Sequence, residues 1–330
     1  MNEFELIERV SHGFPVKADR LIQGVGDDAA VIRSDAGRDW LVTTDALFEG
    51  VHFKTEWTTF QDLGKKALSV NVSDIAAMGG KPLYYFVTIG IPKNFPERDI
   101  DAVFAGMSSV ASNHRMILSG GDTCKSAGGL LLSLTVVGDV ESGKSIFRSG
   151  AKAGDSVYVT GTLGGSSLGL SCLEKGTRGL DVREFIKLHN NPIPRVAAGG
   201  WLSASGCVSS MIDVSDGLAQ DLGHISRASE VGIKIDSSLL PLPENFKEGT
   251  NACYKDSYAL ALTGGEDYEL AFTISNEKLQ LFEKMLKVVQ PTFGHPVTKI
   301  GEVIEGEGVV AVDVHGIDIP LSRVGFEHKF

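Results

Sequence analysis

Seven aspartates are the residues of this chain whose types and positions point most directly to chemistry. Each lies beside small residues where an expected strand or helix begins or ends, so that side chains from distant segments can converge. They are Asp27, Asp28, Asp45, Asp74, Asp122, Asp213 and Asp216. Converging carboxylates repel one another unless cations lie between them. Since Mg²⁺ prefers a few carboxylates together with substrate phosphates, the pattern predicts several Mg²⁺ ions and a polyphosphate substrate.

Most of these aspartates also have a purely structural explanation when each is taken alone. Asp and Ser before a helix commonly cap it, which accounts for Ser215 and Asp216. Asp27, Asp45 and Asp122 fit turns at the ends of strands. The recurrence of acidic residues at such ends, rather than any one of them, favours a shared site.

Asp74 has no such structural explanation. The segment 58–78 predicts a helix, with Leu63, Ala67 and Val70 at helical spacing on its apolar face. Four residues further along that face lies Asp74. Because an ionised carboxylate is very costly to bury alone, Asp74 requires a cation.

The elements that must position these residues alternate between strands and helices in both halves of the chain, which predicts a mixed α/β protein. The polar, glycine-rich stretch "RSGAKAGD" follows one apolar strand and precedes another. We therefore expect a domain boundary there, giving an N-terminal domain over 1–148 and a C-terminal α/β domain over 149–330.

Composition narrows the possible partners. The 330 residues are 42% hydrophobic with a net charge of −11, which argues against nucleic acid and against an anionic membrane surface. No apolar run is long enough to span a bilayer, and the first residues do not resemble a secretory signal, so we expect a cytoplasmic protein. The four cysteines are scattered singly, a pattern that suggests neither a disulfide framework nor a zinc site.

A competing nucleotide-binding motif lies near the expected boundary. Residues 138–145, "GDVESGKS", match the P-loop pattern and follow an apolar strand. The following residues, however, have no helical apolar stripe, and Asp139 and Glu141 would place negative charge in the phosphate cradle. We therefore interpret this stretch as a surface hairpin or linker. A P-loop NTPase that depends on Lys144 is the alternative.

Several motifs in order resemble the thiamine-monophosphate kinase family. They are "GVGDDAAVI", "VTTDALFEGVHF", "KALSVNVSDIAAMGGKP", "LSGGDT", "RSGAKAGDSVYVTGTLG", "IDVSDGLAQDLGHI" and "LTGGEDYEL". The resemblance extends from about Gly24 to Phe326 and implies the two-domain fold of aminoimidazole ribonucleotide synthetase-like proteins. It also implies ATP-dependent phosphorylation of thiamine monophosphate by direct in-line transfer. It further implies that the N-terminal domain over 1–148 binds ATP and Mg and serves dimerisation, in a homodimer whose N-terminal domains form a shared β-barrel.

The same resemblance assigns roles to individual positions. The Mg²⁺ ligands would be Asp28, Thr43, Thr44, Asp45, Asp74, Asp122, Asp213 and Asp216, with Asp27 adjacent. Five of them, Asp28, Asp45, Asp74, Asp122 and Asp213, would serve catalysis through the metal. ATP would contact Gly121, Asp122, Arg148 and Ser215, and the thiamine substrate would contact His52, Glu266 and Phe326. Phe326 departs from the pattern because its ring can stack but carries no hydroxyl. On the residues alone, Arg148 is equally a surface linker charge, and His52 and Glu266 are ordinary structural residues.

The chemistry of this reaction places few demands on protein bases. Donor and acceptor are both phosphates, so catalysis consists mainly of charge neutralisation and positioning. A phosphate monoester with a second pKa near 6 is already largely deprotonated at pH 7, so no general base is required. The alternatives are another ATP-dependent enzyme of the same superfamily, such as a selenophosphate synthetase, or a non-catalytic cation-binding protein. A selenophosphate synthetase would carry a reactive Cys near its start, and residues 1–23 contain none.

Overall fold

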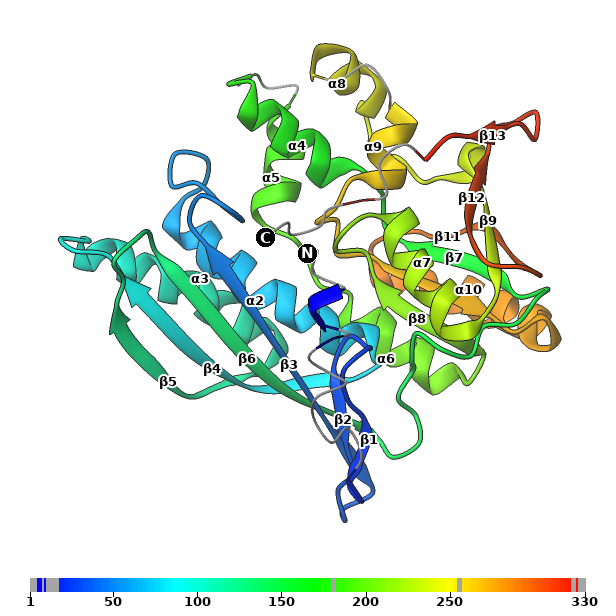
Figure 1. Ribbon diagram of the computed structural model, residues 1–330, viewed down its shortest axis with the longest axis horizontal. Helices are drawn as coiled ribbons and strands as arrows, with labels where there is room; N and C mark the ends of the chain where they lie inside the picture. The colour runs from blue at the N-terminus through cyan, green and yellow to red at the C-terminus, as the bar shows by residue number, and fades with distance from the viewer. Residues whose placement is uncertain are drawn as a thin grey trace.

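The computed structural model describes residues 5–7, 9, 18–177, 179, 182–253, 257–321 and 325. Two β-sheets, each covered by helices, form the two halves of the molecule, and helix α2 (Phe60–Ala77) lies between them (Figure 1). The mixed α/β class is therefore confirmed. Among the described residues, no helix is both long and apolar enough to cross a bilayer.

The N-terminal sheet has six strands in the order β1-β2-β3-β6-β4-β5. Their bounds are β1 Leu21–Gln23, β2 Ala30–Ile32, β3 Arg38–Phe48, β4 Lys81–Ile91, β5 Ile117–Lys125 and β6 Leu131–Glu141. Helices α2 and α3 (Glu97–His114) pack on one face of this sheet and bury its apolar side chains. The strands alternate between buried and more exposed residues, as expected for a sheet covered on one side only.

The other face of the N-terminal sheet is left open and carries large apolar side chains. Trp40, Phe48, Tyr84 and Phe86 are each between 38% and 47% exposed. Every residue of the edge strand β5 is exposed. An open apolar face beside an unpaired edge strand is typical of a surface that another chain covers.

The C-terminal sheet has seven strands in the order β13-β12-β9-β11-β7-β10-β8. Their bounds are β7 Ser156–Thr160, β8 Val208–Asp213, β9 Gly232–Asp236, β10 Leu270–Ile274, β11 Val297–Ile304, β12 Gly308–Val312 and β13 Asp318–Ile319. All residues of the central strands β7 and β10 are buried, because helices cover both faces of this sheet.

The helices of the C-terminal half fall into three groups. Helix α7 (Leu218–Ser229) packs on one face of the sheet, and α6 (Val196–Ser205) with α10 (Leu279–Phe293) packs on the other. A third group contributes a small separate core. Its members are α4 Gly165–Glu174, α5 Arg183–Asn190, α8 Phe246–Cys253 and α9 Ser257–Thr263.

Helix α2 confirms the helix expected over 58–78. It begins after Thr59, whose hydroxyl accepts the Asp62 backbone N–H at 3.0 Å, as an N-cap does. Its last turn touches α6 of the other half, where a Cβ on Gly199 would lie 2.2 Å from the Ala76 carbonyl oxygen. Only glycine permits this close approach, which brings the two halves together along α2.

Two of the expected strand ends are wrong. β5 continues through Gly121 and Asp122 because it pairs with β4 as far as Lys125, so Asp122 lies inside the strand. β3 likewise continues past Asp45 to Phe48 because it pairs with β6 along its whole length. Asp45 and Asp122 are therefore held by sheet hydrogen bonds rather than by turns.

Candidate active site

Three of the predicted aspartates meet where the two halves of the chain touch. Asp28 precedes β2, Asp74 lies on α2, and Asp213 ends β8. One carboxylate oxygen of each lies within 4.8 Å of the others. Asp28 and Asp213 are buried and Asp74 is half-buried, so the group is a converging acidic site and not a solvated surface.

The charges in this group oppose one another. Burial raises the pKa of Asp74 well above its usual value, and Asp45, Asp213 and Asp28 raise it further. Burial, together with Asp28, raises the pKa of Asp213 to about 8. Hydroxyls partly offset the repulsion: Thr43 donates to Asp74, and Ser73 donates to Asp213, each at 2.5 Å. The site therefore has too little positive charge for its carboxylates.

Arg148 provides the cation that the structure holds at this site. Its Nη2 and Nε donate to Asp28 Oδ1 at 2.6 and 3.2 Å, and its backbone N–H donates to Asp27 at 3.2 Å. Burial, together with the charge of Asp28, raises the pKa of Asp27 to about 7. Within the described part of the chain, Asp28 Oδ2 is one of two buried side-chain oxygens without a hydrogen-bond partner, the other being Ser145 Oγ. An unpartnered oxygen on a buried aspartate that is clustered with two further carboxylates fits a hard divalent cation.

The neighbouring residues of β3 divide between the two faces of the strand. Thr43 contacts Asp74, whereas Thr44 donates its hydroxyl to the Leu134 carbonyl oxygen at 3.0 Å and so lies away from the acidic group. Asp45 is tied to α2, since its backbone N–H donates to Asn71 Oδ1 at 3.1 Å. This alternation follows from the two-residue period of a strand.

Gly121 and Asp122 lie on the exposed edge strand, outside the acidic group of this chain. Gly121 has a φ of +155°, and a Cβ there would lie 1.9 Å from the Val87 carbonyl oxygen. Its glycine is thus required for the close pairing of β5 with β4. The Asp122 side chain accepts the Thr123 backbone N–H at 2.9 Å.

The turn after β8 holds Ser215 and Asp216 beside the first acidic group. Asp216 belongs to a second group with Asp221 and His224, in which one ligand atom of each residue lies within 4.8 Å of the others. Asp221 Oδ2 accepts the backbone N–H groups of Asp216 and Gly217 at 3.1 and 3.0 Å, which sets the shape of the turn. Burial lowers the pKa of His224 to about 3, so its imidazole is neutral at pH 7.

The predicted substrate residue Glu266 lies on an adjoining turn. Its backbone N–H donates to the Ser215 carbonyl oxygen at 2.7 Å. Burial acts to raise the pKa of Glu266, but Lys66, His189 and His52 outweigh it and hold the pKa below its usual range. Phe326 lies outside the described residues.

Comparison with known proteins now identifies the family. Residues 26–140 and 152–314 match the models of the AIR synthase related protein N-terminal and C-terminal domains. The thiamine-monophosphate kinase of Bacillus subtilis (strain 168) is 37% identical over 333 residues, covering 99% of each protein. The chain belongs to the thiamine-monophosphate kinase family.

Solved structures of this kinase family have the same fold. The structure described as AaThiL complexed with AMPPCP and TMP has a TM-score of 0.85 and 31% identity, and the match covers 99% of this chain and 97% of that one. The thiamine-monophosphate kinase of Stenotrophomonas maltophilia K279a has a TM-score of 0.77 and 34% identity, with 97% and 99% covered. The resemblance found from ordered motifs is therefore confirmed.

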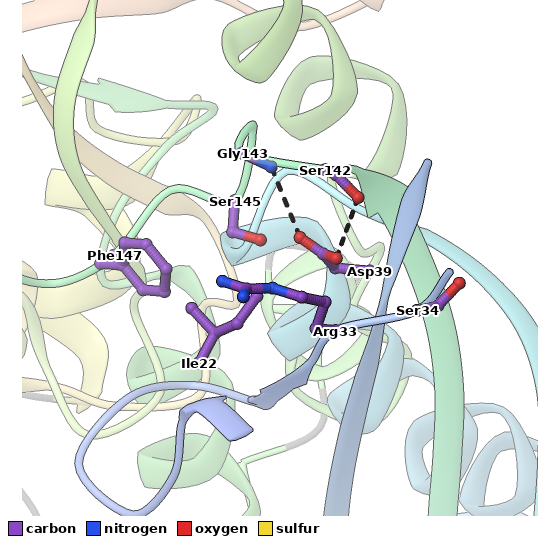
Figure 2. Close-up of a pocket in the computed structure, with 8 residues that line it drawn as sticks. All are labelled: Ile22, Arg33, Ser34, Asp39, Ser142, Gly143, Ser145 and Phe147. Atoms are coloured by element: carbon purple, nitrogen blue, oxygen red, sulfur yellow. Dashed lines mark hydrogen bonds between the residues drawn. The ribbon is translucent and has the colours of Figure 1, made fainter. Parts of the chain in front are cut away.

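In this thiamine-monophosphate kinase family member, the P-loop-like stretch 138–145 is the end of strand β6 followed by a turn. The Lys144 backbone N–H donates to the Glu141 carbonyl oxygen at 2.9 Å, and residues 142–155, all of them described, contain no helix. Figure 2 shows Asp39 bonded to the Ser142 hydroxyl and the Gly143 N–H, at 2.9 and 3.4 Å. A carboxylate thus occupies the donors that a P-loop offers to phosphate. The pocket of about 430 Å³ beside this turn is lined by none of the clustered aspartates.

Three polar residues of α2 that contact predicted site residues were not themselves predicted. They are Lys66, Asn71 and Ser73, and like their neighbour Ser69 they are at most 2% exposed. Lys66, Ser69 and Ser73 are spaced i, i+3 and i+7, so they share one helix face. Polar residues at helical spacing inside an apolar helix were the signal that could have revealed them.

Proposed function

We propose that this chain transfers the γ-phosphoryl group of ATP directly to the phosphate of thiamine monophosphate and releases thiamine diphosphate. The observation that carries the proposal is the buried group of Asp28, Asp74 and Asp213 with its unpartnered oxygen, in a chain whose structural neighbour is described with AMPPCP and TMP. Both reacting groups are anions, so such a reaction depends on a site built for cations.

In this proposal Asp28, Asp74 and Asp213 hold Mg²⁺ ions, assisted by Thr43, Asp45 and Asp216. Thr44 and Asp122 lie outside this acidic group, and their role as ligands of further Mg²⁺ ions remains a prediction. When bound, Mg²⁺ would neutralise phosphate charge and align the two phosphates. Arg148 would donate to an ATP phosphate in place of Asp28, using the same fork of N–H groups. Gly121 and Ser215 would contact the nucleotide as well.

The thiamine part of the substrate would lie away from the phosphates, in contact with His52, Glu266 and Phe326. Two contacts support this arrangement. The Glu266 turn is hydrogen-bonded to Ser215, and a Cβ on Gly325 would lie 2.6 Å from the Asp216 carbonyl oxygen. The residue preceding Phe326 therefore lies against the Asp216 turn. The domain boundary at 148–149 and a cytoplasmic location remain predictions.

The test is an assay of ADP release with Mg-ATP, with and without thiamine monophosphate, combined with chromatography of thiamine diphosphate. We expect product only when both substrates are present, and we expect Lys144→Ala to retain the activity because the 138–145 turn is not a phosphate site. Absence of thiamine diphosphate would contradict the proposed function. Loss of activity in Lys144→Ala would favour the P-loop alternative instead.

We also propose that the chain acts as a homodimer that covers the open face and the exposed strand β5 of the N-terminal sheet. Covering this apolar face is favourable by the hydrophobic effect, and pairing β5 would satisfy its free backbone groups. The dimer would also bury Gly121 and Asp122, which a single chain leaves on its edge. Sedimentation equilibrium should give twice the 35.2 kDa of one chain. A Phe86→Asp variant, with its charge on the open face, should shift the mass toward the monomer.

A further inference from the structure

Lys66 is buried in a way that calls for a functional explanation. It lies on α2 with 3% of its side chain exposed, and its ammonium is 2.8 Å from Glu266 Oε1 in the other half of the chain. A lysine side chain is long enough to reach water from most positions, and burying its charge is costly unless a partner fixes it. The adjacent Lys65, by contrast, pairs with Asp62 on the same helix and is 24% exposed.

Both oxygens of Glu266 are held by buried groups. Oε2 lies 3.1 Å from Nδ1 of His189 on α5, and the same nitrogen lies 3.1 Å from Ser166 Oγ. Burial lowers the pKa of His189 to about 4, so its ring is neutral at pH 7 and Lys66 supplies the positive charge in this contact. About a quarter of the Glu266 side chain remains exposed, which leaves it accessible to a ligand.

The same helix face also positions the acidic group. Ser73 lies seven residues after Lys66, two helical turns away on the same side of α2. Ser73 donates to Asp213 at 2.5 Å, across the contact between the two halves. One face of α2 thus holds a carboxylate of the acidic group and a carboxylate of the predicted substrate end.

We propose that Lys66 is a positioning residue that fixes Glu266 for contact with the thiamine end of the substrate. The same helix face fixes Asp213 of the acidic group through Ser73, so both ends of the site are positioned by α2. The inference rests on the proposed function, which assigns Glu266 to that contact. Without the ammonium, Oε1 loses its charged donor, and the carboxylate is held only through Oε2 by His189, so its orientation toward the bound substrate is less well fixed. The loss would concern binding of thiamine monophosphate and not binding of ATP, because Lys66 pairs with Glu266, whereas Arg148 pairs with Asp28.

The test compares Lys66→Met with Lys65→Met, a matched change one residue away. We expect Lys66→Met to raise KM for thiamine monophosphate about tenfold to a hundredfold, with KM for ATP changed less than about twofold. Lys66→Arg keeps the charge and should recover part of the loss. Lys65→Met should behave as the unmodified chain. An unchanged KM for thiamine monophosphate, or equal increases for both substrates, would overturn the inference.

A double variant separates positioning from folding. Lys66→Met alone removes the charged partner of Glu266 and could impair folding, whereas Lys66→Met with Glu266→Gln removes both charges together. If Lys66 acts through Glu266, the double variant should have the same KM for thiamine monophosphate as Glu266→Gln alone. A further increase in the double variant would contradict positioning through Glu266. Absence of product from the unmodified chain would overturn the proposed function together with this inference, whereas normal turnover with an unaffected Lys66→Met would overturn the inference alone.

Discussion

Asp74→Asn is expected to lower kcat/KM for thiamine diphosphate formation about 10²- to 10³-fold while raising the melting temperature of the metal-free protein. Asparagine is nearly isosteric and can still accept the Thr43 hydroxyl. It removes one of the charges that repel one another in the acidic group, so the folded state gains stability while the cation site loses a ligand. Steady-state kinetics and thermal melts in the presence of a chelator would measure the two effects.

The stability gain should depend on pH in a defined direction. The pKa of Asp74 is raised in the folded state, so its contribution to stability is fully present below its unfolded pKa of about 4 and is lost as pH rises toward the folded value. The advantage of Asp74→Asn in metal-free buffer should therefore grow as pH rises from about 4. Added Mg²⁺ should stabilise the unmodified chain more than the variant. Asp101→Asn, on the exposed side of α3, is the control and should leave both properties unchanged. Full activity in Asp74→Asn would exclude Asp74 as a metal ligand.

Arg148→Ala is expected to destabilise the metal-free protein by about 3 kcal/mol and to raise KM for ATP at least tenfold. The substitution leaves Asp28, with 1% of its side chain exposed, without its cation. Breaking a buried pair in this way is costly because the remaining charge cannot reach water. Chemical denaturation with and without Mg²⁺ is the measurement, and Mg²⁺ should recover much of the lost stability by occupying the freed carboxylate.

The chain offers a close control for this variant. Arg38 forms a two-point ion pair with Asp139 at 2.5 and 2.6 Å, but the Arg38 side chain is 48% exposed. Arg38→Ala should therefore cost less than about 1 kcal/mol and leave KM for ATP unchanged. Equal effects of the two substitutions would show that Arg148 is an ordinary surface linker charge, which is the structural alternative that the sequence alone allows.

Periodicity in the sequence was sufficient to predict the helix that carries Asp74 and the mixed α/β class. It could not place Thr44, because the direction of a strand side chain depends on which face the helices cover, and that is set by tertiary packing. Nor could it predict the extension of β3 and β5 past Asp45 and Asp122, since strand length depends on the pairing partner as much as on local residues.

The convergence of Asp28, Asp74 and Asp213 was predicted from the recurrence of acidic residues and from motif order, but not from local spacing. These residues are far apart in the chain, and only the fold sets their separation of under 4.8 Å. Lys66 was missed because a lysine in a helix is usually solvated, and its partner Glu266 lies 200 positions away. Long-range ion pairs have no signature in a single sequence.

Helix α2 has a consequence for how such proteins can be recombined. Two separate family models describe the two halves, which suggests interchangeable modules. The contacts of α2 argue otherwise, because exchanging either half with that of a relative would have to preserve the Lys66–Glu266 pair, the Ser73–Asp213 bond and the glycine at 199 simultaneously. A chimera that keeps every metal ligand but loses one of these contacts would have an unpaired charge or a steric clash where α2 meets the C-terminal half. The contacts of α2 with the C-terminal half therefore have to be exchanged together with the sheets that they join.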